Sequence, residues 1–327
     1  MYPCSSERCF IYFAHMTCAA TPESILRHPA LAGFLSRHTR PKKDGCLLAV
    51  FDCDGTIIKG DIGERMFFRQ IEHLFFRHSP AELWSDHPDR SRLGEVYAAV
   101  TAIGKEARAQ SPEFAEFASL LLTRYFNQVR HGDVVKGCVD ITRLFAGFTI
   151  GEVRRFADET LREEIAAPMG VRHLGGQELP RGIRYIREAV DLYRALVARA
   201  FEIYAISGSN RWSVEQVFAQ LGLATDRVIG IDLEDDAGVL TARSKEPVPI
   251  HENKLSALEM VTRCRPLLVA SDSKRDLPLL LSSSELKVRI DSKGRDKDEF
   301  FAAAGAPPDD SWILIDHPTL LESLAHG

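Results

Sequence analysis

Uninterrupted runs of apolar residues, each followed by small or acidic residues, recur in two separated parts of the chain. The first run, Leu47–Phe51, ends at Asp52 and Asp54, and later runs lie at 202–206, 266–270, 287–290 and 312–315. Such runs are typical of strands buried on both faces of a parallel sheet. Helical patterns separate them at 211–221 and 251–260. We therefore expect an α/β fold, with a doubly wound, mostly parallel sheet covered by helices on both faces.

Residues 61–200 follow another pattern, in which apolar residues recur at helical spacing and strong strand runs are missing. Thr149 and Glu152 have the spacing of a capping box, so a helix is expected from there to about Ala167. Other helices are expected at 63–76, 91–109, 112–129 and 183–200. The segment has the size of a separate, all-helical domain inserted between two strands of the sheet.

These patterns divide the chain into three parts. Residues 1–42 form an N-terminal tail and a helix that is expected to begin at Pro22, or translation starts at Met16. Residues 43–60 and 201–327 form the α/β core, in which Asp235–Gly238 connects a hairpin, and residues 61–200 form the insertion. The apolar stretch Phe10–Ala14 is too short to span a membrane and is a poor signal-peptide core.

Composition excludes several classes of protein. The 327 residues are 45% hydrophobic and 27% charged, as in an ordinary globular protein, and the net charge of −5 gives no footprint for a nucleic-acid partner. Seven scattered cysteines contain no Cys-x-x-Cys pair, so neither a zinc site nor a disulfide framework is indicated. Reduced thiols in a cytoplasmic protein are the expectation, and the oligomeric state is left open.

Candidate chemistry gathers where the predicted strands end. Asp52 and Asp54 follow the first run, Ser207 and Gly208 follow the second, and Asp272 and Asp276 follow the third. Lys254 opens a helix between them. Each feature has a simpler interpretation: an acidic turn, a serine helix cap, an exposed lysine. Parallel strands end at one edge of a sheet, however, so these side chains are expected to meet there. Paired carboxylates at such an edge suit Mg²⁺.

Taken together, these residues resemble the four motifs of the haloacid dehalogenase-like (HAD) phosphohydrolases. The motifs are Asp52-x-Asp54-Gly55-Thr56, the Ser207-Gly208 strand end, Lys254, and Asp272-Ser273-x-x-Asp276. The resemblance covers about 43–60 and 201–295, and the helical insertion looks like the cap of the phosphoserine phosphatase-like branch. It implies a Rossmann-like core and a Mg²⁺-dependent phosphatase.

The resemblance also implies roles for individual residues. Asp52 would be the nucleophile that forms an aspartyl-phosphate, and Asp54 the general acid and base. Mg²⁺ would be held by Asp52, Asp54 and Asp272, and Asp276 would orient Lys254 or lie in the outer shell of the metal. The phosphoryl oxygens would contact Ser207, the Gly208 amide and Lys254, and Thr56 would fix the loop beside them. Asp61, Glu64 and Arg65, which join core and cap, are candidates for binding the substrate.

The chain departs from phosphoserine phosphatases at two positions. They usually carry a glutamate where this chain has Asp61, and Gly-Asp-Gly-x-x-Asp where it has Ser271–Asp276. The fourth motif and Gly182-x-Arg184 look more like phosphocholine phosphatase-like relatives. A quaternary ammonium would need aromatic faces, which the insertion could supply, although aromatic residues at helical spacing also fit a core: Phe67, Phe68, Phe75, Phe76, Trp84 and Tyr97.

The function expected is hydrolysis of a small phosphorylated metabolite that resembles phosphoserine or phosphocholine. Two alternatives remain: a phosphotransferase that uses the same aspartyl-phosphate, and a non-catalytic binding module on the same fold.

Overall fold

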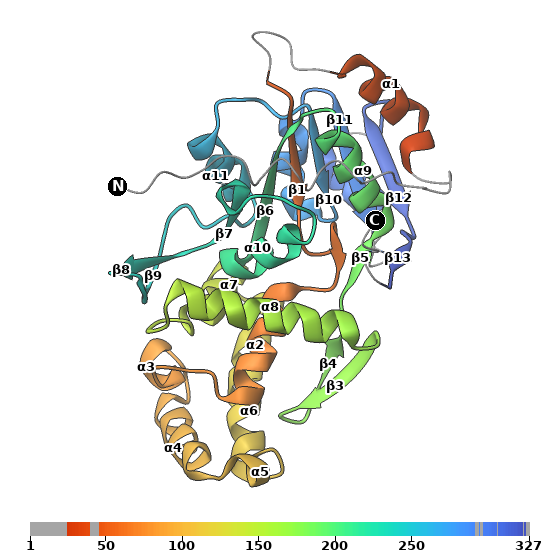
Figure 1. Ribbon diagram of the computed structural model, residues 1–327. Coiled ribbons are helices and arrows are strands. Elements are labelled where there is room, and N and C mark those ends of the chain that lie inside the picture. Colours follow the sequence, from red (N-terminus) through yellow and green to blue (C-terminus); the bar gives the residue numbers. More distant parts are fainter. Residues whose placement is uncertain are drawn as a thin grey trace, which may run out of the picture.

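The structure, a computed structural model, describes residues 25–39, 46–291, 294, 297–305, 307–322 and 324. Figure 1 shows a core built on a parallel sheet and a second, mainly helical part beyond the end of strand β1 (Leu48–Asp52). The helix predicted to begin at Pro22, and the tail before it, start outside the described residues. The described chain opens instead with η1 (Ile25–Arg27) and α1 (Pro29–Arg37).

The core sheet has six strands, and every neighbouring pair is parallel. Their spatial order is β12 (Trp312–Asp316), β11 (Leu286–Asp291), β10 (Leu268–Ser271), β1, β6 (Glu202–Asn210) and β7 (Val228–Ile231). Of the strands that follow β1 in sequence, β6 and β7 lie on one side of it, and β10, β11 and β12 lie on the other. The order therefore reverses between β1 and β10, which is where open α/β sheets place their ligands. The predicted doubly wound sheet is confirmed.

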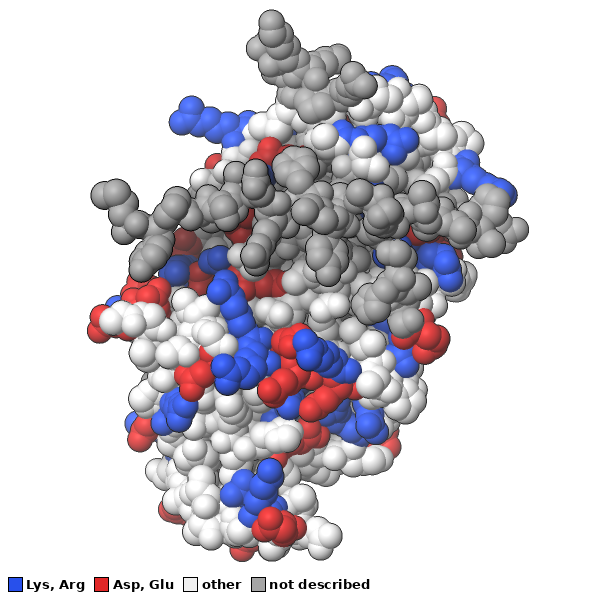
Figure 2. All heavy atoms as spheres, viewed as in Figure 1, with Lys and Arg blue, Asp and Glu red and all other residues white. Residues whose placement is uncertain are grey.

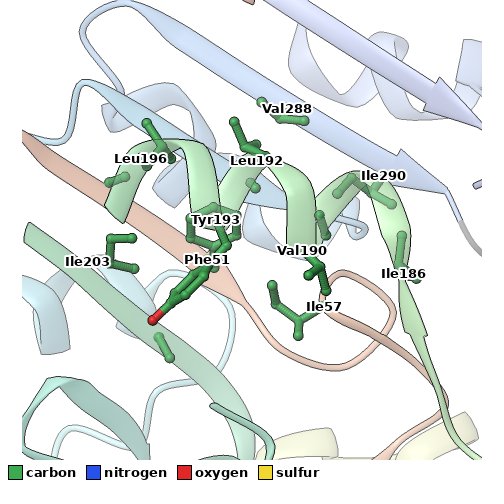
Figure 3. Close-up of a cluster of buried hydrophobic side chains, with 14 of the residues drawn as sticks. Phe51, Ile57, Ile186, Val190, Leu192, Tyr193, Leu196, Ile203, Val288 and Ile290 are labelled. Carbon is green, nitrogen blue, oxygen red and sulfur yellow. The ribbon is translucent and has the colours of Figure 1, made fainter. Parts of the chain in front are cut away.

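Helices cover both faces of this sheet. One face packs against α1, α9 (Arg187–Val197) and α10 (Arg211–Ala219), where Figure 3 shows Phe51 of β1 beside Tyr193 of α9. The other face, which includes Leu48 and Val50, packs against α11 (Asn253–Val261), α12 (Leu277–Ser282) and α13 (Lys297–Ala304). Because β1 is buried on both faces, its apolar run is continuous and does not alternate.

The insertion has its own hydrophobic core, centred on side chains such as Phe67, Trp84 and Phe117. Its helices are α2 (Ile62–His73), α3 (Pro80–Leu83), α4 (Arg90–Ala102), α5 (Lys105–Arg108), α6 (Pro112–His131), α7 (Val134–Arg143) and α8 (Ile150–Ala166). The capping box predicted at Thr149 and Glu152 is present at the start of α8.

Two features differ from the predicted all-helical insertion over 61–200. A hairpin of β3 (Gly170–Leu174) and β4 (Gln177–Arg181) follows α8, and Leu174 and Leu179 bury their side chains in the core of the insertion. In addition, the predicted helix 183–200 begins with a strand, β5 (Arg184–Ile186), and α9 packs on the sheet of the core. The cap therefore consists of residues 61–181.

The chain passes between core and cap through two paired strands. β2 (Ile58–Lys59) leads into the cap, β5 leads back, and the two pair antiparallel, with β13 (Leu320–Leu321) on the other side of β5. A glycine with positive φ lies next to each crossing: Gly60 at 127° and Gly182 at 87°. A Cβ on Gly60 would lie 2.9 Å from Ile183 Cγ1, so the close approach of the two crossings needs glycine there.

The face of the molecule that carries α8 is highly charged but of mixed sign. Figure 2 shows Lys and Arg interspersed with Asp and Glu across its middle, over α8. Arg69 of α2 bridges Glu159 and Glu163 of α8, and Arg154 of α8 pairs with Glu215. On this face the charges therefore form ion pairs between elements, and neither sign dominates the electrostatic field. A hairpin of β8 (Leu233–Asp236) and β9 (Val239–Ser244) projects beside it, around the predicted turn.

The expectation of reduced thiols is wrong for one pair. Cys46, just before β1, forms a disulfide with Cys264, just before β10, and their Cα atoms lie 6.0 Å apart. These two strands are neighbours, so the pairing follows from tertiary structure and leaves no signal in cysteine spacing. Cys53 and Cys138 are free thiols, and the remaining cysteines lie outside the described residues.

Across the described ranges, no helix combines the length and the apolar character that a membrane span requires.

Candidate active site

Asp52 is the last residue of β1, and the loop after it is held in a fixed form. Asp52 is 4% exposed, and Thr56 Oγ1 donates a hydrogen bond to its Oδ2 at 2.9 Å. Gly55 has φ +89°, and a Cβ there would lie 2.0 Å from Asp272 Oδ2. The glycine therefore lets the loop after β1 close against Asp272 at the end of β10. The Thr56 hydroxyl thus contacts the Asp52 carboxylate, within the loop that it was predicted to fix.

Asp54 accepts three hydrogen bonds. The backbone N–H of Ile62 donates to its Oδ1 at 2.8 Å, while the hydroxyls of Ser207 and Ser209 donate to its Oδ2 at 2.9 and 2.7 Å. The strand was predicted to end at Ser207, but β6 continues to Asn210. Ser209 was not among the predicted site residues, although residues i and i+2 of a strand point to the same face.

Lys254 joins the first and last motifs. Its Nζ donates to Asp52 Oδ1 at 2.7 Å and to Asp276 Oδ2 at 2.8 Å, and Ser271 Oγ also donates to Asp276 Oδ2, at 2.6 Å. The lysine is 5% exposed because α11 begins against the sheet edge. The predicted meeting of four distant segments at one edge is therefore observed.

Burial and charge shift the pKa values of the two aspartates that follow β1. Burial raises the pKa of Asp52 to about 7, although Lys254 opposes the rise. Burial, and next the charge of Asp61, raise the pKa of Asp54 to about 8. Burial also opposes the charge on Lys254, but Asp276 and Asp52 outweigh it and raise its pKa above the ordinary 10.5. Near neutral pH, Lys254 is charged and Asp54 retains a proton.

These shifts give a pH dependence of stability in the metal-free protein. The unfolded chain releases both protons near pH 3.8, whereas the folded protein keeps them to about pH 7 and 8. The stabilisation is therefore complete at low pH and is lost as the pH rises through these folded-state values, by up to about 1.4 kcal/mol per pH unit for each group.

We expect the free energy of unfolding in a chelator to fall between pH 5.5 and 8.5, measured with denaturant. The Asp54→Asn variant should show a shallower fall, because its amide does not titrate. Metal-free stability that rises over this range would contradict the pKa values.

A cavity of about 190 Å³ opens on these groups, and residues of the cap line its other side. Asp61 and Glu64 of the predicted set line it, but Arg65 does not. The buried Arg65 guanidinium turns away, and its Nε lies 3.3 Å from Glu164 Oε2. Further cap residues that were not predicted also line the cavity: Tyr125, Val129, Val134, Cys138, Ile141 and Thr142. The six aromatic residues considered for a quaternary ammonium pack elsewhere, in the core of the cap and in the cluster where the cap meets α10, β8 and β9.

The acidic cluster can hold a cation. Asp52, Asp272 and Asp276 are buried, and one carboxylate oxygen from each lies within 4.8 Å of the others. Lys254 pairs with two of these three carboxylates. Buried like charges at this distance repel one another, and hard oxygen donors are the ligands that divalent cations such as Mg²⁺ prefer.

The sequence profile of the haloacid dehalogenase-like hydrolases matches residues 49–281. The chain belongs to this family. The prediction made from the four motifs is thereby confirmed, and the chain is a HAD-type hydrolase. A comparison with curated proteins gave no match.

Solved structures similar to this HAD hydrolase include two proteins without a stated function. A protein from Anaerococcus prevotii DSM 20548 aligns with TM-score 0.66 and 19% identity, over 79% of this chain and 83% of that one. A protein from Bordetella pertussis Tohama I aligns with TM-score 0.52 and 18% identity, over 83% and 99%. A substrate-bound phosphoserine phosphatase aligns with TM-score 0.39 and 12% identity, over 76% and 87%. The first two likenesses support the fold.

Proposed function

We propose that this protein is a Mg²⁺-dependent phosphomonoesterase that hydrolyses a small phosphorylated metabolite through an aspartyl-phosphate, with a phosphoserine-like or phosphocholine-like ester as substrate. The observation that carries the proposal is the placement of the two acids after β1. Asp52 accepts a hydrogen bond from Lys254 Nζ at 2.7 Å, and Asp54, two residues on, is held by the Ile62 N–H and by the hydroxyls of Ser207 and Ser209. Burial also raises the pKa of Asp54, which favours the protonated form that a general acid needs. A candidate nucleophile and a candidate general acid therefore line one cavity.

In the first half of the proposed reaction, Asp52 attacks phosphorus and the bond from phosphorus to the leaving oxygen breaks. Asp54 gives its proton to that oxygen, so the leaving group departs as an alcohol. The hydroxyl of Ser207 turns from Asp54 to a phosphoryl oxygen, and the amide of Gly208 and the Lys254 ammonium bind the others, which offsets the charge that develops on them.

In the second half, Asp54 takes a proton from water as the water oxygen attacks phosphorus. The bond from phosphorus to Asp52 then breaks, which releases inorganic phosphate and regenerates both acids. Asp276 keeps Lys254 in place through its 2.8 Å contact. The cap shields the aspartyl-phosphate from bulk water.

Mg²⁺ would be held by the side chains of Asp52 and Asp272 and by the backbone carbonyl of Asp54. When bound, it offsets phosphoryl charge and orients the ester for attack.

The test is hydrolysis of an aryl phosphate by the purified full chain, with Mg²⁺ and with excess chelator. We expect turnover with Mg²⁺, a fall of at least about 100-fold in chelator, and recovery when Mg²⁺ is restored. Added acceptor alcohol separates hydrolysis from transfer, because a transferase needs the acceptor for turnover. A folded protein that is inactive against the aryl ester and a panel of phosphorylated metabolites would refute the proposal.

A further inference from the structure

The sides of the cavity differ in polarity according to the elements that supply them. Charged side chains come from the sheet edge, the starts of α2 and α11, and η3 (Lys274–Asp276): Asp52, Asp54, Asp61, Glu64, Lys254, Asp272, Arg275 and Asp276. The side chains that α6 and α7 contribute are uncharged: Tyr125, Val129, Val134, Cys138, Ile141 and Thr142. Burial raises the pKa of the Cys138 thiol well above its ordinary value, so this thiol stays neutral and behaves as a small apolar group.

One side of α7 faces the cavity, and another side fixes the helix within the cap. Val134, Cys138 and Ile141 are spaced by four and then three residues, which places them in one stripe along a helix. On a different side of α7, the buried Asp140 carboxylate accepts a hydrogen bond from Arg124 Nη2 at 2.9 Å. The stripe is therefore held toward the cavity by contacts on the rest of the helix.

Val129 of α6 and Ile250 of the core extend this stripe. A Cβ on Gly137 would lie 3.1 Å from Val129 Cγ2, so the glycine lets α7 pack closely on α6 at this point. Val134 and Cys138 pack against the hydrophobic cluster that contains Ile250. Together these side chains form what we call the apolar wall of the cavity: Val129, Val134, Cys138, Ile141 and Ile250.

The apolar wall begins beside the proposed phosphoryl site. A Cβ on Gly208 would lie 3.2 Å from Ile250 Cγ1, and the Gly208 amide is one of the proposed phosphoryl ligands. An alcohol esterified at this site therefore has aliphatic side chains next to it. Burying hydrocarbon against such side chains favours binding by about threefold for each methylene group.

We propose that the alcohol part of the substrate is recognised through methyl and methylene groups that pack on the apolar wall. The proposal rests on the proposed phosphatase function and narrows its substrate class. A phosphocholine-like ester presents such groups along its whole length. In phosphoserine, the carbon next to the ester methylene carries a carboxylate and an ammonium, which would lose water against aliphatic side chains.

A series of n-alkyl phosphates tests the contact directly. Ethyl, propyl and butyl phosphate have leaving alcohols of nearly equal acidity, so they differ mainly in the hydrocarbon that the cavity can bury. We expect kcat/KM of the full chain with Mg²⁺ to rise by about threefold for each added methylene. Phosphoserine should be hydrolysed with a lower kcat/KM than propyl phosphate.

A second pair of esters separates hydrocarbon contact from recognition of a cation. Phosphocholine and 3,3-dimethylbutyl phosphate have the same shape, but a carbon replaces the charged nitrogen in the second. We expect kcat/KM for 3,3-dimethylbutyl phosphate to be at least about one third of the value for phosphocholine, because methyl groups make the contact in both. A smaller fraction overturns the proposal, since it shows that the charge is recognised.

Variants locate the contact on the apolar wall. Val134→Thr and Val129→Thr keep the shape of the side chain and replace a methyl group with a hydroxyl. Each should lower the ratio of kcat/KM for butyl over ethyl phosphate by about threefold. Val135→Thr is the matched control, because Val135 follows Val134 in α7 and packs on the same cluster but does not line the cavity. It should leave the ratio as in the wild type.

The possible outcomes are distinguishable. Hydrolysis of the aryl ester together with equal kcat/KM for the three alkyl phosphates overturns this inference and leaves the phosphatase standing. Variants that lower kcat/KM for ethyl and butyl phosphate equally also overturn it, because they show a structural effect without hydrocarbon selection. Failure to hydrolyse any ester overturns both.

Discussion

The Asp52→Asn variant is expected to lose hydrolysis of every phosphate ester, by on the order of 10⁴-fold or more in kcat. An amide oxygen is a poor nucleophile, and Asp54 lies in the wrong loop position to replace it. Asp54 is held by Ile62 N, Ser207 and Ser209, whereas Asp52 is held by Thr56 and Lys254. The measurement is steady-state hydrolysis with Mg²⁺, together with acid-quench trapping of labelled phosphoenzyme. Wild type should trap label and the variant none.

The variant is expected to fold, so its loss of activity can be interpreted. Asparagine has nearly the shape of aspartate, and the substitution removes one like charge from the cluster with Asp272 and Asp276. Lys254 retains Asp276 as its partner. Asp226→Asn, at an exposed aspartate of the core, is the matched control and should keep wild-type activity. Asp52→Asn turnover equal to that of wild type would remove the aspartyl-phosphate mechanism.

The sheet and the meeting of the four motifs were predictable because both depend on local patterns. β1 and β10 are buried on both faces, so their sequences are continuously apolar up to the acids that follow. A parallel sheet brings such strand ends to one edge whatever the loops between them do. For that reason Asp52, Lys254 and Asp276 were predicted to meet without any knowledge of the cap.

The cap was harder to predict because its elements carry weak or ambiguous patterns. The hairpin of β3 and β4 buries Leu174 and Leu179, while Val171 is exposed and Pro180 lies in the second strand, so alternation is hardly visible. Helix α9 has a well-formed apolar face, but that face would look the same if it packed on the cap. Membership in a domain depends on contacts that a single helix does not encode.

Side-chain direction explains the errors at the site. Glu64 and Arg65 are successive residues of α2, which point about 100° apart around a helix, so the two side chains leave the helix in different directions. Glu64 lines the cavity, and Arg65 pairs with Glu164. The sequence pattern pointed to the turn of helix that lines the cavity but did not separate the acid from the base.

Lys254→Met is expected to lower both activity and stability. The loss of stability identifies Lys254 as a buried structural cation, because loss of an exposed phosphate ligand would lower activity alone. Its Nζ contacts Asp52 and Asp276 at 2.7 and 2.8 Å in a buried site. Removing one partner of a buried ion pair costs about 3–5 kcal/mol, because the remaining charges are uncompensated. The lost stabilisation of phosphoryl charge should also lower kcat/KM by about 10² to 10³-fold. Denaturant unfolding in chelator and steady-state kinetics measure the two effects, and Lys105→Met, at an exposed lysine of the cap, is the control.

The double variant Lys254→Met/Asp276→Asn separates the two roles of the lysine. Asp276→Asn removes one of the carboxylates that Lys254 compensates, so the double variant should recover part of the lost free energy of unfolding. Its activity should stay low, because nothing replaces the ammonium beside the nucleophile.

The loss of stability in Lys254→Met should also be larger at pH 8 than at pH 5.5, since protonation of Asp52 relieves the uncompensated charge at the lower pH. If Lys254→Met unfolds like wild type at both pH values, the ion pairs of Lys254 contribute nothing to the fold, and its role is confined to the phosphoryl group.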